Sequence, residues 1–257
     1  QHWVGISGLV LSDESPCPEM PTQCWNSVRG RRLRATRVDA CGAPVTGTCS
    51  QVVTDGFVTI SFSPEIAEGE DIEVRKADGT LCISDQGCPE LKWINVEAEF
   101  CQVDPDLFSL FTGYPTVMDW EANAVGVRIT SEIECDAGAA MELWTDVPGQ
   151  VCGSTAAKPW GYFLLPWIKH AIISDFEITN DATTFTLTGR TQAGSLWGVG
   201  PYDVDPTDAT NTPGKLRTAI GPSEHLDLHL TTVPPPAAQC GCQALNPPPP
   251  QQLAEAA

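Results

Sequence analysis

The sequence predicts a mainly β protein, a β-sandwich with one short flanking helix. Apolar and polar residues alternate in many short segments, of which 56–62 and 124–135 are the clearest, and such alternation is typical of strands covered on one face. One segment opens as a helix does, because Asp104 is an N-cap residue and a helix-initiating proline follows it. Gly113 supplies the stop signal. We therefore expect about ten strands and one helix, at 104–112.

The strands can be placed in order along the chain. Asp78-Gly79 is a strong hairpin signal between a strand at 72–76 and a returning strand at 81–83. Segment 160–170 is apolar on both faces, which predicts a strand covered on both sides. The further strand candidates are 93–103, 124–135 with its expected neighbour 139–147, 172–178 and 183–190 joined by a turn at Asn180-Asp181, and 224–230.

Composition divides the chain into three parts. Residues 1–50 read as an irregular N-terminal arm and long loop, available for contacts with other chains. Residues 51–232 hold the strands and the helix. Residues 233–257 contain runs of three and four prolines, which are typical of a polyproline or disordered extension. We expect this extension to lie on a neighbouring copy of the protein.

The charge balance excludes two classes of partner. The chain has 33 acidic against 14 basic side chains and a formal net charge of -19. A reader of duplex nucleic acid needs positive charge to displace counterions, and an anionic membrane surface attracts basic segments. The longest apolar run, 162–168, is far too short to span a bilayer. We therefore expect no membrane association, although a protein that encloses DNA without gripping it remains compatible with this charge.

Eleven cysteines leave three interpretations open: buried or free thiols, some disulfides, or a metal site. Their spacings match no familiar zinc pattern. Cys240 and Cys242 form a lone C-x-C pair, which is a weak metal signal.

Motifs for catalysis are absent from the sequence, and we expect no enzyme and no cofactor. His225 and His229 are four residues apart, but they fall within a strand pattern and lack the H-E-x-x-H helix of a zinc-binding pair, so we favour solvated or interfacial histidines over a metal pair. Asp203, Asp205 and Asp208 loosely suggest a calcium loop, but the spacing departs from the EF-hand form. The eight tryptophans could form a sugar-binding platform or serve as core and interface anchors, and we favour the second reading.

The sharpest local feature is a cluster of arginines that we call the arginine strip. Its members are Arg29, Arg31, Arg32, Arg34 and Arg37. Arginine pairs well with carboxylates, and the chain offers an acidic segment of its own. The members of this acidic segment are Glu65, Glu68, Glu70, Asp71 and Glu73. We expect the two to meet between copies of the protein; a solvated loop and a nucleic-acid contact are the alternatives.

Three longer segments carry a family resemblance. PELKWINVEAEFCQVDPDLFSLFTGYP, PWGYFLLPWIKH and FTLTGRTQAGSLWGVGPYDV resemble the major tail tube proteins of long-tailed, siphovirus-type bacteriophages, particularly those of actinobacteria. The resemblance implies a β-sandwich with a helix on its flank, six copies forming a ring whose inner strands close into one β-barrel, and rings stacked through long loops and terminal arms. It covers residues 56–203, and the cysteine content and the proline-rich tail depart from the expected pattern.

The function implied by the resemblance is that of a structural virion protein. Such a protein polymerises into the tail tube in the host bacterial cytoplasm, and its partners are its own copies, a tape-measure protein, and tail terminator and distal tail proteins. Double-stranded DNA passes without specific contacts through its acidic lumen. Two alternatives stay open: a secreted carbohydrate-binding or glycoside-cleaving β-sandwich, and a cytosolic metal protein that uses Cys240 and Cys242.

Overall fold

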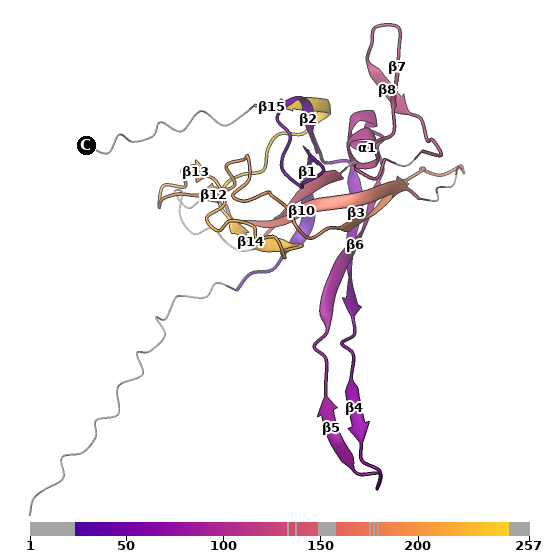
Figure 1. The fold of residues 1–257 in the computed structure, drawn as a ribbon. Helices are drawn as coiled ribbons and strands as arrows, with labels where there is room; N and C mark the ends of the chain where they lie inside the picture. Colours follow the sequence, from indigo (N-terminus) through magenta and orange to yellow (C-terminus); the bar gives the residue numbers. More distant parts are fainter. Residues whose placement is uncertain are drawn as a thin grey trace, which may run out of the picture.

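The computed structural model describes residues 24–132, 134–136, 138–148, 158–174, 176, 178 and 180–246. This part of the chain is mainly β with one short helix, which is consistent with a β-sandwich, as the sequence predicts. Figure 1 shows a compact body from which two hairpins project toward opposite ends, β4–β5 at one end and β7–β8 at the other. No helix in these residues is long and apolar enough to cross a membrane.

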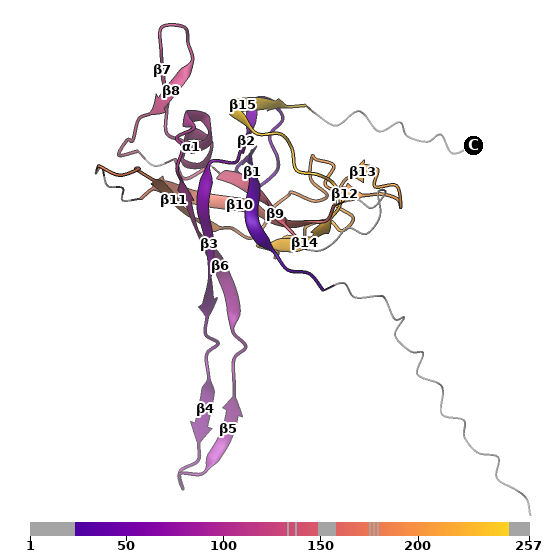
Figure 2. The same cartoon turned by 180° about the vertical axis from the view of Figure 1, so that it is seen from behind.

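One large antiparallel sheet forms the body. Its strands in spatial order are β15 (Gln239–Leu245), β2 (Gly47–Thr54), β1 (Val28–Val38), β9 (Gly138–Asp146), β10 (Trp160–Ile173), β11 (Phe185–Thr191), β6 (Glu90–Phe100) and β3 (Phe57–Ala67), and β14 (Asp227–Thr231) also pairs with β10. The two-stranded ladders are β4 (Ile72–Arg75) with β5 (Leu81–Asp85), β7 (Thr116–Met118) with β8 (Ala124–Val127), and β12 (Asp205–Pro206) with β13 (Pro213–Gly214). Figure 2 shows from behind how β3 and β6 continue out of the body toward β4 and β5.

Helix α1 (Pro105–Thr112) covers one face of the sheet. The Asp104 side chain accepts hydrogen bonds from two backbone N–H groups of the first turn, and Gly113 ends the helix in the left-handed conformation at φ 73°. The sequence prediction of this helix is therefore confirmed. Leu107 and Phe108 are buried against β1, β6, β9 and β10, so this short helix gains its stability from packing.

The other face of the sheet is covered by the chain between β11 and β14. Trp197, Val204 and Leu216 from this segment pack on Trp144 and Tyr162 of the central strands. The sheet thus has a hydrophobic core on each side, and β9 and β10 contribute to both.

Strand β10 shows how one strand serves two cores. Leu165 faces the helix side, and after a bulge between Leu165 and Ile168 the order of faces changes, so that Trp167 lies in the second core. Pro166 sits inside this bulge, where its missing N–H does not interrupt the ladder. The prediction that 160–170 is covered on both sides is confirmed.

Several predicted boundaries are wrong. Residues 28–38 form β1, a central strand paired with β2 and β9, and not part of an arm. Within the proline-rich extension, 239–245 form edge strand β15 on β2, and the glycine at 241 lets this segment approach the helix. Residues 1–23 of the predicted arm and 247–257 of the predicted extension lie outside the described residues.

The strand expected at 124–135 is also shorter than predicted. β8 ends at Val127 and pairs with β7, whereas 138–146 form β9 between β1 and β10. The Asp119 side chain accepts hydrogen bonds from the backbone N–H groups of Glu121 and Asn123, so a tight local turn directs β8 back onto β7.

Candidate assembly surface and side-chain clusters

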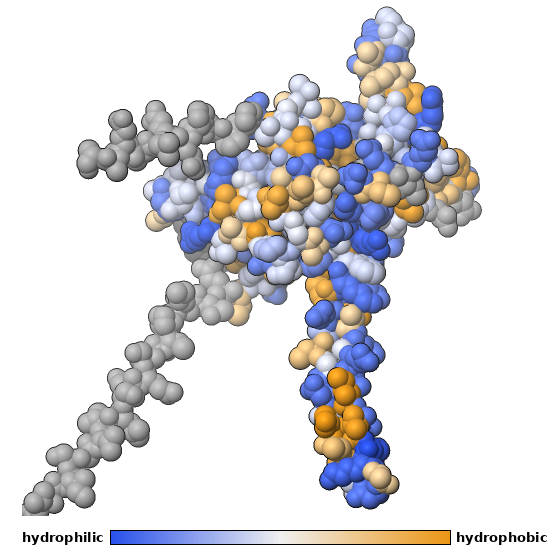
Figure 3. Space-filling model, in the orientation of Figure 1, coloured by the Kyte–Doolittle hydropathy of each residue, from blue (hydrophilic) through white to orange (hydrophobic). Residues whose placement is uncertain are grey.

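The β4–β5 ribbon carries an unpartnered apolar face. Val74 lies directly opposite Ile83, and Ile72, two positions from Val74, shares their side of the ribbon. The ladder shifts its register next to this pair, where Leu81 lies opposite Arg75. The four apolar side chains are 45% to 53% exposed. Figure 3 shows an orange patch on this hairpin, which is otherwise largely hydrophilic.

The turn of this ribbon forms as the sequence predicts. Asp78 accepts a hydrogen bond from the Thr80 backbone N–H at 2.9 Å, and Gly79 adopts φ 84°. The Asp78 carboxylate accepts hydrogen bonds from the Thr80 hydroxyl and from the Thr80 backbone N–H. These bonds, with the hydroxyl as the larger cause, lower the pKa of Asp78.

The acidic segment runs along the same projecting hairpin. All five of its members, Glu65, Glu68, Glu70, Asp71 and Glu73, are exposed. Glu73 accepts a hydrogen bond from Arg75 at 2.8 Å, an exposed pair on the ribbon. The hairpin therefore combines an apolar face with a surplus of negative charge.

Two glycines form a constriction between body and ribbon. A Cβ at Gly69 would lie 2.2 Å from a backbone atom of Gly87, and a Cβ at Gly87 would lie 2.7 Å from the Glu70 nitrogen. The main ladder ends with the pairing of Ala67 and Glu90, and the ribbon ladder starts beyond the glycines. We call this place the glycine joint.

The β7–β8 hairpin exposes apolar side chains at the opposite end of the molecule (Figure 1). Trp120, in its turn, is 90% exposed, and Met118 and Val125 are exposed beside it. An isolated exposed apolar residue needs no explanation, but a group at the tip of a projection marks an interaction surface.

The arginine strip, which the sequence predicts to meet the acidic segment between copies of the protein, forms part of a strand. All five of its members lie on β1, between β2 and β9 in the sheet. Arg29 and Arg37 are exposed, but Arg34 is buried. Arg31 pairs with Asp146, which Lys158 also contacts, and Arg32 donates to Asp55 at 2.9 Å. Among the ion pairs of the described residues, none joins the strip to the acidic segment.

Arg34 forms a buried charge cluster on the second face of the sheet. Its guanidinium donates two hydrogen bonds of 2.6 Å to the Glu142 carboxylate, which also accepts one of 2.7 Å from the Tyr162 hydroxyl. The guanidinium stacks 3.3 Å from the Tyr202 ring centroid and 5.0 Å from that of Trp144. Arg34 thus links two central strands to the covering segment.

The electrostatics of this cluster keep its charges paired. Burial alone would lower the pKa of Arg34, but the Glu142 carboxylate reverses the effect and raises it. Burial, together with the charge of Glu142, raises the pKa of Tyr162 well above its ordinary value. Sequence reasoning missed this cluster, although the position of Arg34 between Leu33 and Ala35 in an alternating strand was a usable signal.

A second ionic cluster lies beside a pocket of about 520 Å³. The His229 ring bonds to Asp227 at Nδ1 (2.8 Å) and to Asp205 at Nε2 (2.9 Å). Burial alone would lower the pKa of His229, but the two carboxylates raise it to about 9. Burial would raise the pKa of Asp205, yet hydrogen bonds from His229 and the Arg217 N–H bring it below its usual value. Both carboxylates are therefore held by an imidazolium.

The other residues considered for metal or sugar binding are not brought together. Asp203 pairs with Lys215 at 3.5 Å. Asp208 instead accepts hydrogen bonds within its own turn, and these bonds, of which the one from the Thr210 hydroxyl is the largest cause, lower the pKa of Asp208 to about 2. His225 is buried on Thr191, away from the partners of His229. Three tryptophans, Trp144, Trp167 and Trp197, are core residues, and Trp120 is the widely exposed one in the described part.

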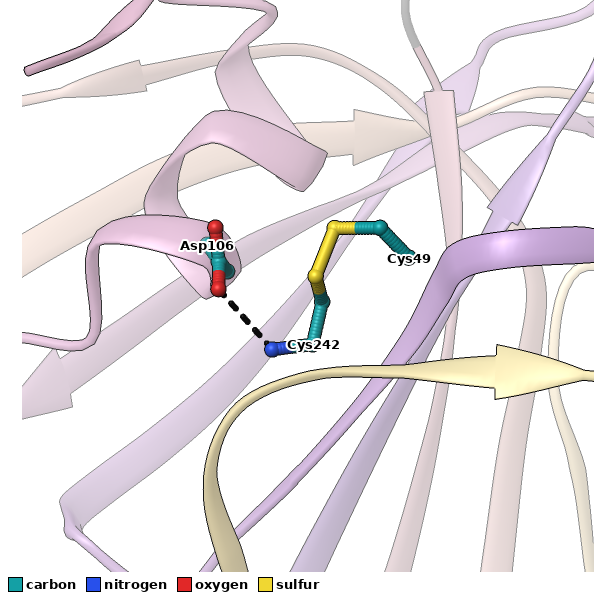
Figure 4. A group of neighbouring side chains, drawn as sticks. All are labelled: Cys49, Asp106 and Cys242. Carbon is teal, nitrogen blue, oxygen red and sulfur yellow. Dashed lines mark hydrogen bonds between the residues drawn. A yellow bond between two sulfur atoms is a disulfide. The ribbon is translucent and has the colours of Figure 1, made fainter. Parts of the chain in front are cut away.

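Cys242 lies beside Cys49 rather than acting with Cys240. The two form a disulfide that joins β15 to β2, and Asp106 at the start of α1 accepts a hydrogen bond from the Cys242 N–H at 2.9 Å (Figure 4). Of the three interpretations of the cysteines, this pair supports a disulfide. The C-x-C pair is divided, since Cys240 is exposed beside Gln102.

No protein-family model matches this chain, and no curated protein matches it in sequence. The described residues define a mainly β protein with two projecting hairpins, each of which carries several exposed apolar side chains. Such an arrangement is suited to binding another macromolecular surface.

Proposed function

We propose that this protein is a structural subunit that polymerises through its projecting hairpins, and specifically that it builds the tail tube of a long-tailed bacteriophage. The observation that carries the proposal is the β4–β5 ribbon. An isolated two-stranded hairpin is marginally stable in water, and this one presents its apolar face to solvent. Docking on a second copy would cover that face.

The positions of the two hairpins favour head-to-tail assembly. The ribbon and the β7–β8 hairpin project from opposite ends, so a contact between them joins two different surfaces. Heterologous contacts of this kind generate rings or open filaments, whereas a two-fold contact would stop at a dimer. The outer edge of β3, the last strand of the sheet, offers a further backbone surface through which copies could close a ring.

The negative net charge of the chain is consistent with a tube through which DNA passes. A net charge of -19 per copy repels phosphates, so a lumen lined with part of this charge would let DNA slide without binding. The resemblance to tail tube proteins supplies the hexameric ring, the stacking of rings and the remaining partners of this proposal. The carbohydrate-binding alternative gains no support from the positions of the described tryptophans.

The test is a charge placed on the apolar face of the ribbon. Ile83→Asp should abolish rings and tubes in negative-stain images and leave a single small species in sedimentation velocity. Ser84→Asp is the matched control, because Ser84 lies opposite Glu73 and puts the same charge one residue from Ile83 on the opposite side of the strand, and this variant should still polymerise. Circular dichroism of both variants should match that of the wild type, since the ribbon lies outside the two cores.

Two results would reject the proposal. One is a wild-type chain that stays a monomer at every concentration; the other is an Ile83→Asp variant that assembles normally. Charge reversal at Arg31 and Arg32 is a poorer test of self-association, because it would also disrupt the ion pairs with Asp146 and Asp55.

A further inference from the structure

Three potential metal ligands meet where the C-terminal strand is fastened to the body. One ligand atom each from Cys49, Asp106 and Cys242 lies within 4.8 Å of the other two, and all three residues are half-buried. They come from three elements far apart in the sequence, namely β2, α1 and β15 (Figure 4). No other such group of three occurs among the described residues.

Strand β15 needs a fastening at this place. Its ladder with β2 has two register shifts in seven residues, and its only deeply buried hydrophobic side chain is Leu245. The Gly241 and Cys242 N–H groups donate to the carboxylates of Asp104 and Asp106, both at 2.9 Å. Gly241 adopts φ 80°, and a Cβ there would lie 3.3 Å from the Asp106 carboxylate, so glycine permits the close approach.

We propose that, when the disulfide is reduced, Cys49, Cys242 and Asp106 bind one zinc ion. Two thiolates and a carboxylate are ordinary zinc ligands, and thiolates on a tetrahedral zinc lie about 3.8 Å apart, given Zn–S bonds of about 2.3 Å. The two sulfurs reach that separation through a small movement of their side chains. Asp106 Oδ2 already accepts the Cys242 N–H, which leaves Oδ1 for the metal, and water takes the fourth position.

The chemistry balances with a dithiol as reductant. The dithiol gives two electrons and two protons to the disulfide, which breaks the S–S bond into two thiols while the reductant closes to its own cyclic disulfide. Zinc then displaces the two thiol protons to solvent and forms two Zn–S bonds. The disulfide and the zinc site are thus alternative fastenings of β15 to β2 and α1. This inference does not depend on the proposed function.

Cobalt titration of the reduced full-length protein tests the site. After dithiothreitol treatment and its anaerobic removal, Co²⁺ should give tetrahedral visible bands and a sulfur-to-cobalt charge-transfer band of two thiolates. One equivalent of Zn²⁺ should abolish both. The oxidised protein should show neither, and a spectrum that is unchanged by oxidation would overturn the proposal.

Single variants assign the ligands. Cys49→Ser and Cys242→Ser should each remove half of the charge-transfer intensity or abolish binding, whereas Cys240→Ser, two residues from a ligand, should bind as the wild type does. Asp106→Asn keeps an acceptor for the Cys242 N–H but loses the negative charge. Because losing only a partner of a metal ligand lowers metal affinity by about tenfold or more, the loss of Asp106 as a direct ligand should lower zinc affinity by more than about tenfold. Full binding by Cys242→Ser, or its loss in Cys240→Ser, would refute the assignment.

A measurement on the wild type covers the case of a variant that fails to fold. Zinc should protect Cys49 and Cys242 of the reduced protein from alkylation, read by mass spectrometry of peptides, while Cys82 and Cys88 of the projecting hairpin remain reactive. Equal labelling of Cys49 with and without zinc would contradict the site.

Discussion

Strand β9 and the β4–β5 ribbon both carry apolar side chains at alternating positions, but their surroundings are opposite. In β9, side chains of both faces are buried, those on one side against helix α1 and those on the other against the covering segment. In the ribbon, Val74 and Ile83 form an equally apolar face with nothing upon it. The comparison shows that alternation specifies a strand and its faces, while the cover comes from elsewhere in the chain or from another chain.

The largest contrast should appear on removing one apolar side chain from each region. Phe108→Ala should lower the free energy of unfolding by about 3–5 kcal/mol, since the phenyl ring is buried among the strands on the helix side. Ile83→Ala should change it by less than about 0.5 kcal/mol in the monomer. Urea unfolding at low protein concentration measures both, and similar losses would mean that the ribbon packs on its own body.

Ion pairs should show the same contrast on a smaller scale. Glu142→Gln leaves the buried Arg34 charge without its counter-ion and should cost roughly 3 kcal/mol. Glu73→Gln breaks an exposed pair with Arg75 and should cost less than about 0.5 kcal/mol. Thermal unfolding of the two variants compares them directly. A negligible effect of Glu142→Gln would show that the Arg34 charge finds water or another partner.

The His229 cluster predicts a pH dependence that belongs to the body. Because folding raises the pKa of His229 from 6.5 to about 9, its stabilising effect is complete below pH 6.5 and is lost as the pH rises through 9. The loss should be on the order of 3 kcal/mol by linkage. Urea unfolding between pH 6 and 10 should show this decline, and His229→Gln should flatten it. A wild-type curve that rises over this range would contradict the assignment.

The smallest effect should come from the glycine joint. Gly69→Ala forces the two backbones apart, so ribbon amides should exchange hydrogen several-fold faster, while the unfolding temperature of the body stays within about one degree. Gly126→Ala on β8 is the control, because a Cβ there meets only Val117 at 4.0 Å. Unchanged exchange across the ribbon would show that the joint tolerates a side chain.

The features that could be predicted from sequence are those encoded locally. Asp104 and Gly113 define the helix, Asp78-Gly79 defines the ribbon turn, and the doubly apolar character of 160–170 indicates its burial on both faces. Each signal lies within a few residues of the structure that it specifies.

The features that could not be predicted depend on distant partners. The sequence suggested a docking strip at 29–37 that is exposed for contacts with other copies, whereas Arg34 is buried against Glu142, which lies 108 residues away. The Cys49–Cys242 bond spans 193 residues, and eleven cysteines offered no way to select that pair. The candidate assembly surface was anticipated through its acidic residues, but its apolar face needed the register of β4 and β5 to be recognised.

The glycine joint has a mechanical consequence. Two chain segments connect the β3–β6 ladder to the β4–β5 ladder, one between Ala67 and Ile72 and the other between Asp85 and Glu90. They come closest at Gly69 and Gly87, where neither segment has a side chain. Bending stiffness is therefore lowest there. The proposed filament could thus curve by bending at the same place in every subunit while the docked contacts stayed intact.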